Sequence, residues 1–253
     1  MGKVYNLTID RGNTAAKVSL WGLGPSQADR SVWHRVYTHI DADDIADICR
    51  DHPVRTAIYA SVSESPATLL DALHKACSDV MILTPGTPVP LTVCYRTPDT
   101  LGVDRLAAAV GARTLPQADG RPLLIADIGT AITNDHVTAD GRNMGGNIAP
   151  GIFMRLQALN HYTARLPMVE PVADCPVWGD DTNSALVAGA VNGVVAELQY
   201  YRSRLPADAL TVVTGGAADL VIGRLSSSHI YVENLVSLGL EDIINFNRPG
   251  QQL

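Results

Sequence analysis

The chain has 253 residues, of which 46% are hydrophobic and 18% charged, and this composition suits a folded protein with a sizeable core. The formal net charge of −7 argues against broad binding to nucleic acid, which requires a basic surface. The sequence has no run of 18 apolar residues and no basic-then-apolar leader, so we expect a cytoplasmic protein with no membrane partner. The cysteines form no C-x-x-C pair, and we expect reduced, half-buried thiols at Cys49, Cys77, Cys94 and Cys175.

The N-terminal segment alternates apolar and polar residues, which predicts two antiparallel strands joined by a tight turn. The strands are expected at 4–9 and 16–22, and the turn between them begins with Asp10-Arg-Gly-Asn-Thr. Glycine lets the backbone approach a ligand closely, and the ammonium group of Lys17 suits phosphate oxygens. A solvated lysine at a sheet edge is the alternative interpretation of Lys17.

Helices and strands are expected to alternate through the next part of the chain. Ser65 is expected to cap a helix whose first residue is Pro66, because proline is favoured at that position. The expected elements are helices at 41–49 and 66–76, strands at 56–62 and 80–83, and a Pro- and Thr-rich loop at 85–90.

The stretch from Tyr95 to Arg105 is expected to lead into an apolar helix that starts near residues 98–100. Asp104 and Arg105 would lie in or near its first turn, where the helix dipole stabilises an anion by about 0.3–1 kcal/mol. A helix-terminal Asp beside a surface Arg is the alternative. Residues 116–122 form a polar connection and are the expected boundary between two halves.

The segment 123–151 repeats the arrangement of the N-terminal hairpin. An apolar strand leads to Asp127, then to Gly129 and Thr130, then to an antiparallel strand and a turn at Gly145-Gly146. Asp127 follows Asp10 by 117 positions, about half the chain length, which predicts two similar halves at 1–117 and 121–253. Chance similarity of two hairpins is the alternative. We expect an α/β fold with a ligand site in the cleft between the halves.

The remaining elements follow from periodicity and turn residues. Gly189 and Gly193 are four positions apart, which permits close packing against another helix or a second subunit. The expected elements are helices at 151–166, 185–204 (capped by residues 182–184), 217–225 and 238–246, and strands at 210–213 and 232–234, with a Thr214-Gly-Gly turn before the third helix.

Five motifs, taken in their order and spacing, resemble those of the type III pantothenate kinases. They are Asp10-x-Gly-Asn-Thr-x-x-Lys17, Tyr95 followed by Gly102-Val-Asp-Arg105, Asp127-x-Gly-Thr130, Gly145-Gly-x-Ile-x-Pro-Gly151 and Thr214-Gly-Gly216. The resemblance spans residues 4 to about 220. It implies the acetate/sugar kinase, Hsc70 and actin superfamily, in which two ribonuclease-H-like halves with a central cleft bracket ATP.

The resemblance implies ATP-dependent phosphorylation of pantothenate to 4′-phosphopantothenate, the first step of coenzyme A biosynthesis. It also implies Mg²⁺ with the nucleotide, a monovalent cation (K⁺ or NH₄⁺) and a homodimer. Asp104 would accept the proton, Asp127 would bind the monovalent cation, and Asp10 would position Mg²⁺ through water. The residues implied for ATP are Asp10, Arg11, Gly12, Asn13, Thr14, Ala15, Ala16, Lys17 and Thr130; those for pantothenate are Tyr95, Gly102, Val103, Asp104, Arg105 and Thr182.

Several residues depart from the family pattern: Arg11, Asn134, His136 and Ala217. None replaces an implied catalytic group, although Arg11 and Ala217 adjoin the turns expected near the nucleotide. The alternative function is a non-catalytic accessory or regulatory factor that binds nucleotide or pantothenate. A sugar kinase of the same superfamily is disfavoured because the C-x-C-G-x-x-G-C zinc motif is absent, and dinucleotide-binding and P-loop motifs are also absent. The seven histidines show no metal-ligand spacing.

Overall fold

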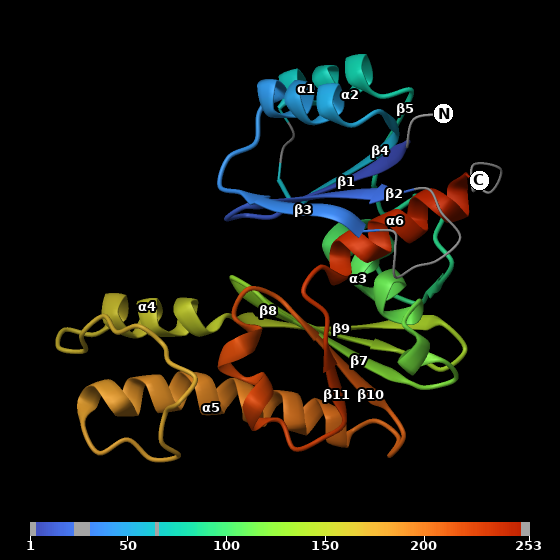
Figure 1. Ribbon diagram of the computed structural model, residues 1–253. Helices are drawn as coiled ribbons and strands as arrows, with labels where there is room; N and C mark the ends of the chain where they lie inside the picture. The colour runs from blue at the N-terminus through green and yellow to red at the C-terminus, as the bar shows by residue number, and fades with distance from the viewer. Residues whose placement is uncertain (1–3, 23–30, 64–65, 249–253) are drawn as a thin grey trace. The chain divides into compact units, whose positions relative to one another are not determined.

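The structure is a computed structural model that describes residues 4–22, 31–63 and 66–248 (Figure 1). Its packing divides the chain into two units. The first unit comprises Met1–Thr114 and Asn234–Leu253, and the second comprises Leu115–Glu233. The division after Thr114 lies just before the expected boundary at 116–122, whereas the residues from Asn234 onward pack with the first unit instead of the second half.

The first unit contains a mixed sheet with the strand order β3-β2-β1-β4-β5. β1, β2 and β3 are antiparallel neighbours, whereas β4 is parallel to β1 and β5 is parallel to β4. The bounds are β1 Tyr5–Arg11, β2 Ala16–Gly22, β3 Ser31–Tyr37, β4 Val54–Ser61 and β5 Asp79–Ile82; a short strand, β6, follows at Thr92–Val93. The expected hairpin is therefore present, and β3 extends it as a third strand that the sequence did not predict.

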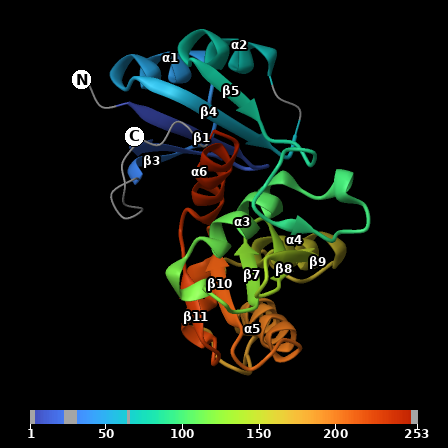
Figure 2. The same cartoon turned by 90° about the vertical axis from the view of Figure 1, so that its right-hand side faces the viewer.

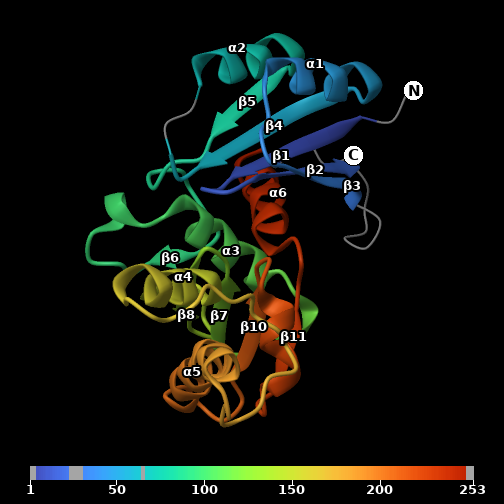
Figure 3. The same cartoon turned by 90° about the vertical axis from the view of Figure 1, so that its left-hand side faces the viewer.

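Helices cover both faces of this sheet (Figures 1, 2 and 3). α1 (Ala42–Asp51) and α2 (Ala67–Ala76) lie on one face, where Leu7 and Ile9 of β1 join their apolar core. α6 (Leu235–Asn247) packs on the opposite face, where the side-chain amide of Asn6 donates to the buried carboxylate of Glu241 at 3.2 Å. Because side chains alternate along a strand, Asp10 shares the face of Asn6.

α3 (Val103–Arg113) packs against α6, and this contact places the C-terminal helix in the first unit. Two glycines allow the approach. A Cβ at Gly239 would lie 1.8 Å from the carbonyl oxygen of Ala107, and one at Gly111 would lie 2.4 Å from that of Leu235. The sequence could not place α6, because close contact between residues far apart in the chain leaves no periodic signal.

The second unit repeats the topology of the first. The strands that belong to this unit follow the order β9-β8-β7-β10-β11, with β7, β8 and β9 antiparallel and with β10 and β11 parallel to β7. The bounds are β7 Leu123–Ile128, β8 Ala131–Val137, β9 Arg142–Pro150, β10 Leu210–Thr214 and β11 His229–Tyr231. The prediction of two related α/β halves, each opening with a hairpin, is confirmed.

Two helices pack on one face of the second sheet, α4 (Ile152–Tyr162) and α5 (Thr182–Ser203) (Figure 1). Their apolar residues form a core with Ala126, Ile128 and Ile132 from β7 and β8. Because Asp127 lies between two of these inward-facing residues, its side chain is on the other face of β7. Within the described residues, no helix combines the length and the apolarity needed to cross a lipid bilayer.

Four local expectations were wrong in detail. The Gly145-Gly146 pair lies inside β9 and not in a turn. Glycine is needed there for close strand packing, since a Cβ at Gly146 would lie 1.7 Å from the carbonyl oxygen of Asn134 on the adjacent strand. The expected helix at 217–225 is two short 3₁₀ helices, Ala218–Leu220 and Ile222–Arg224, and the expected strand at 232–234 lies earlier, at β11. α5 starts at Thr182 and is capped by Asp181, whose carboxylate accepts from the backbone N–H of Ser184 at 2.7 Å.

The N-terminal end of α2 agrees only in part with the sequence prediction. Pro66 is the N-cap and makes no side-chain cap hydrogen bond, and the helix begins at Ala67. The capping residue predicted there, Ser65, lies outside the described residues. α1 is capped by a side chain, since the Asp41 carboxylate accepts from the backbone N–H groups of Asp43 and Asp44.

Candidate functional site

The hairpin of the first unit turns tightly at the predicted phosphate motif. β1 ends at Arg11 and β2 begins at Ala16, and the backbone N–H of Gly12 donates to the carbonyl oxygen of Ala15 at 3.0 Å. Asn13 and Thr14 are exposed at the tip. The turn therefore presents backbone groups, an amide and a hydroxyl to solvent, and these are the groups that bind phosphate oxygens.

Opposite charges lie side by side at the base of this turn. Asp10 of β1 is the direct antiparallel partner of Lys17 of β2, so the two side chains point to the same face. Asp10 is only 8% exposed, whereas Lys17 is half-buried. The hairpin therefore carries, close to its turn, a carboxylate that can bind a cation and an ammonium group that can bind an anionic oxygen.

A second group of predicted residues gathers at the N-terminus of α3. The backbone N–H of Arg105 donates to Oδ1 of Asp104 at 2.8 Å, which fixes the orientation of the carboxylate at the positive end of the helix. The carboxylate lies against Gly102, where a Cβ would be 2.5 Å from Oδ1. The Gly-Val-Asp spacing thus has a steric reason, since any side chain at Gly102 would displace the carboxylate.

Arg105 and Tyr95 are also brought together. The guanidinium carbon of Arg105 lies 5.6 Å from the centroid of the Tyr95 ring, within the range of a cation–π contact. Arg105 is 5% exposed, and a guanidinium so buried is stabilised by partners that delocalise or pair its charge. The structure therefore assembles Tyr95, Gly102, Asp104 and Arg105 within the first unit.

The hairpin of the second unit is more crowded around its carboxylate. Asp127, at the end of β7, is the register partner of Thr133 on β8 and of Thr214 on β10. Gly215 has a φ of +99°, and a Cβ there would lie 2.5 Å from Oδ1 of Asp127. A side chain at Gly215 would therefore be strained by the backbone and would also collide with the carboxylate.

The next turn residues are packed in the same close manner. The backbone N–H of Gly129 donates to the carbonyl oxygen of Ala131 at 3.2 Å, and that of Gly151 donates to the carbonyl oxygen of Thr130 at 3.0 Å. A Cβ at Gly151 would lie 2.3 Å from the carbonyl oxygen of Gly129. Thr130 itself is exposed, so the hydroxyl predicted to contact phosphate faces solvent on a rigid backbone.

Thr182 is the one predicted pantothenate residue in the second unit. It is the first residue of α5 and is exposed beside the N-cap Asp181. Its assignment to pantothenate stays a prediction, as do the roles assigned to the other site residues.

The residues present fit the implied metal ions. Among the described residues, no group of three or more His, Cys, Asp or Glu side chains could enclose a metal ion. Mg²⁺ in nucleotide enzymes is bound by one or two carboxylates together with water and substrate phosphates, so the single carboxylate of Asp10 suits it. The carboxylate of Asp127 is bordered by backbone that Gly215 allows to approach, and a carboxylate oxygen is a ligand that suits K⁺.

Sequence reasoning missed Thr133 and Thr214 as neighbours of Asp127. Thr214 was noted only as part of a glycine turn, and Thr133 was not noted. Hairpin register could have identified Thr133, because a three-residue connection over residues 129–131 pairs Ile128 with Ile132 and Asp127 with Thr133. The parallel pairing of β10 with β7 is a long-range contact, so no local pattern indicates it.

Comparison with known proteins identifies one family. A sequence model described as type III pantothenate kinase matches residues 6–204. A type III pantothenate kinase of Bacteroides fragilis is 38% identical over 249 residues, covering 96% of this chain and 98% of the relative. One from Phocaeicola vulgatus is 35% identical over 246 residues, with coverage of 96% and 98%.

Solved structures support the fold alone. The (R)-2-hydroxyglutaryl-CoA dehydratase component A of Acidaminococcus fermentans superposes with a TM-score of 0.52 at 14% identity, covering 95% of this chain and 98% of that one. A Campylobacter jejuni chain whose structure carries the name of a Baf family transcriptional activator gives a TM-score of 0.60 at 21% identity, with coverage of 96% and 99%.

Proposed function

We propose that this chain, which belongs to the type III pantothenate kinase family, transfers the γ-phosphoryl group of ATP to the terminal hydroxyl of pantothenate. The product is 4′-phosphopantothenate, and the reaction is the first step of coenzyme A biosynthesis. The observation that carries the proposal is the family match over residues 6–204, which contains every residue implied for the reaction. The arrangement of those residues within each unit supports it.

The hairpin of the first unit is assigned to the phosphates of ATP. Its exposed tip offers backbone N–H groups with Asn13 and Thr14, and Lys17 supplies a positive charge at the base. Phosphoryl transfer passes through a loose transition state, so positioning and charge neutralisation provide most of the catalysis. Thr130 of the second unit is assigned to a phosphate oxygen of the same nucleotide.

Asp104 is assigned to the reacting hydroxyl. A carboxylate is too weak a base to ionise an alcohol in the ground state, so Asp104 orients the hydroxyl and takes its proton as the bond to phosphorus forms. Because Oδ1 already accepts from the backbone N–H of Arg105, we assign Oδ2 to the substrate hydroxyl. The transferred proton then resides on Oδ2 until it exchanges with solvent.

Arg105, Tyr95 and Thr182 are assigned to pantothenate itself. A guanidinium binds a carboxylate through two parallel hydrogen bonds, which suits the carboxylate of pantothenate. The cation–π contact with Tyr95 restricts the guanidinium before substrate arrives, so less entropy is lost on binding. Gly102 and Val103 contribute by fixing the path of the backbone into α3.

Two cations complete the proposal. Asp10 would hold Mg²⁺ through water, and the ion would supply positive charge beside the phosphates. A monovalent cation, K⁺ or NH₄⁺, is assigned to Asp127, whose carboxylate is close to backbone at Gly129 and Gly215. Its role is to balance negative charge beside the nucleotide.

We also assign a homodimer, with α4 and α5 as the contact region. One face of α5 carries small exposed residues, and a Cβ at Gly189 would meet no atom of the described residues within 4 Å. Exposed apolar side chains of the second unit include Ile148 of β9 (66%), Phe153 of α4 (44%) and Tyr200 of α5 (61%). A second copy packing on this face would remove them from water, and light scattering of the purified chain measures that association.

The direct test measures ADP release by the purified protein with ATP, Mg²⁺ and K⁺ over a panel of alcohols. We expect turnover with pantothenate and a product that is heavier by one phosphoryl group in the mass spectrum. Turnover that is absent for pantothenate and every related alcohol would overturn the kinase assignment and leave the non-catalytic binding factor. Glucose and glycerol in the panel separate this activity from that of a sugar kinase of the same fold.

A further inference from the structure

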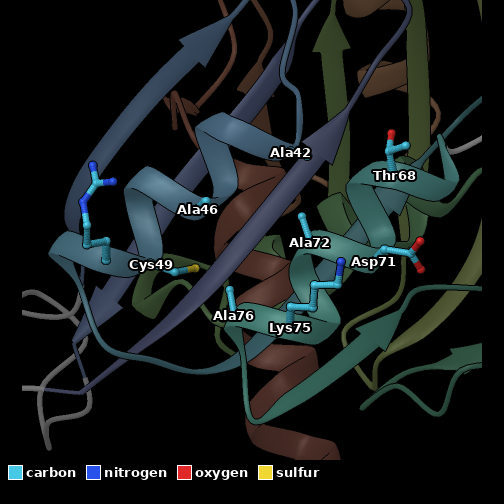
Figure 4. A pocket seen from close by; sticks show the side chains of 9 residues that line it. Ala42, Ala46, Cys49, Thr68, Asp71, Ala72, Lys75 and Ala76 are labelled. Carbon is cyan, nitrogen blue, oxygen red and sulfur yellow. The ribbon is translucent and has the colours of Figure 1, made fainter.

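α1 and α2 lie side by side on one face of the first sheet, with an open hollow of about 550 Å³ between them (Figure 4). Small side chains line much of it, and they leave the space between the two helices unfilled at the surface. Its lining includes Ala42, Ala46 and Cys49 from α1 and Ala72, Lys75 and Ala76 from α2. This hollow contains none of the residues assigned to the kinase reaction.

Cys49 points from α1 toward the last turn of α2 (Figure 4). Its sulfur lies 3.9 Å from the sulfur of Cys77, the residue that caps the C-terminal end of α2. Cys49 is half-buried and lines the hollow, whereas Cys77 is buried. Small reagents in solvent can therefore reach Cys49, while Cys77 lies behind it.

The two thiols are chemically unequal. A hydrogen bond from Cys77 lowers the pKa of Cys49 and outweighs the opposing effect of burial. The same hydrogen bond, together with burial, raises the pKa of Cys77. The thiolate thus forms on Cys49, which is the more accessible sulfur, and the proton stays on Cys77.

We propose that Cys49 and Cys77 form a peroxide-sensitive dithiol, in which Cys49 is oxidised first and Cys77 resolves it to an intramolecular disulfide. The inference rests on the proximity of the two sulfurs and on the hollow that exposes only one of them. It is independent of the kinase activity.

The chemistry balances with one molecule of hydrogen peroxide. The Cys49 thiolate attacks one peroxide oxygen, the O–O bond breaks, and the hydroxide that leaves takes up a proton to become water; Cys49 becomes a sulfenic acid. The Cys77 sulfur then attacks the Cys49 sulfur, the S–O bond breaks, and the departing hydroxide takes the Cys77 proton to form a second water. Two thiols are oxidised by two electrons and one peroxide is reduced.

The geometry allows the bond to form with local adjustment. The sulfurs must approach from 3.9 Å to about 2.05 Å, a movement that rotation of two side chains and the end of α2 can share. The cysteines are 28 positions apart, so the bond would tie α1 to α2 across the segment between them. In a reducing compartment a disulfide of this kind is transient and forms only during oxidation.

The test uses the full chain, reduced and then freed of reductant, with about one equivalent of hydrogen peroxide. Peptide mapping without reductant should recover Cys49 linked to Cys77, with a mass lower by about 2 Da and restored by dithiothreitol. In Cys77→Ala the sulfenic acid cannot be resolved, so dimedone should label Cys49. In Cys49→Ala, Cys77 should remain a thiol under the same treatment.

Cys94→Ala is the matched control, because Cys94 is also half-buried but lies outside the pair, and it should keep the cross-link. Should Cys77→Ala fail to fold, dimedone competition in the unmodified protein replaces it, and the adduct should form on Cys49 alone. The proposal is overturned if Cys49 and Cys77 both remain thiols while Cys94 oxidises, if no cysteine reacts, or if the first adduct appears on Cys77.

Discussion

The two hairpins that open the two units share a topology but differ in how their turns are packed. In the first, Gly12 has an ordinary φ, and a Cβ there would come no closer than 3.5 Å to Ala15. Around the second, Gly129 of the turn, Gly151 after β9 and Gly215 after β10 lie against backbone or against Asp127, and the φ of Gly215 is +99°. The first turn is thus exposed and adaptable, whereas the second is fixed by contacts.

This difference matches the tasks assigned to the two carboxylates. Asp10 has a lysine in register and an exposed turn beside it, which suits a nucleotide that enters and leaves with Mg²⁺. Asp127 is bordered by immobile backbone, which suits a small cation whose ligands must be in place beforehand. Duplication of one fold has therefore given two carboxylate sites with different rigidity.

The largest expected effect comes from adding one methyl group next to each of the two carboxylates. Gly215→Ala should destabilise the protein by about 3 kcal/mol or more, because the backbone is strained for alanine and the Cβ collides with Asp127. That loss corresponds to a fall in melting temperature of roughly 10 °C for a chain of this size. Thermal unfolding followed by circular dichroism measures it.

Gly12→Ala is the matched control, since it adds the same methyl group at the turn that follows Asp10. Its Cβ would be in ordinary van der Waals contact, so the stability change should stay within about 0.5 kcal/mol. Equal losses of stability in the two variants would show that the surroundings of Asp10 and Asp127 do not differ in packing as described.

A smaller effect is expected from exchanging the monovalent cation. Replacing K⁺ by Na⁺ at constant ionic strength should lower turnover or the affinity for ATP, since the fixed backbone around Asp127 is adapted to one ionic size. Asp127→Asn should weaken the apparent K⁺ affinity by about tenfold or more, equivalent to about 1.4 kcal/mol. Steady-state rates measured over a K⁺ titration, with choline as the balancing cation, give the value.

Asp10→Asn is the corresponding substitution in the first hairpin and separates the two sites. It should raise the Mg²⁺ concentration required for turnover while leaving the K⁺ titration midpoint unchanged. A K⁺ response that survives Asp127→Asn, or one that disappears in Asp10→Asn, would contradict the assignment of the monovalent cation to the second hairpin.

Local patterns predicted most of the elements that carry the site. Alternation located both hairpins. The helix expected to start near residues 98–100 begins later, since Pro98–Thr100 is a separate 3₁₀ helix and α3 starts at Val103, but Asp104 lies in its first turn as expected. The repeated Asp-x-Gly turn indicated two related halves, which the matching strand orders confirm. These features are local in the chain, so their spacing alone carries the information.

The features that were not predicted depend on contacts between distant residues. α6 joins the first unit because Gly239 lets it approach Ala107 of α3. Gly146 lies in a strand, where the absence of a side chain allows close contact with the carbonyl oxygen of Asn134, although a Gly-Gly pair is more typical of a turn. The role of Gly102 in leaving room for the Asp104 carboxylate likewise appears only in three dimensions.

The most direct test of the central claim measures product formation and nucleotide binding in the same preparation of Asp104→Asn. The variant removes a negative charge while keeping the shape of the side chain. Phosphopantothenate formation, followed by mass spectrometry, should fall at least about 100-fold relative to the unchanged protein, while ATP binds with unchanged affinity in calorimetry. Phosphopantothenate formation at a near-normal rate in Asp104→Asn would contradict the account.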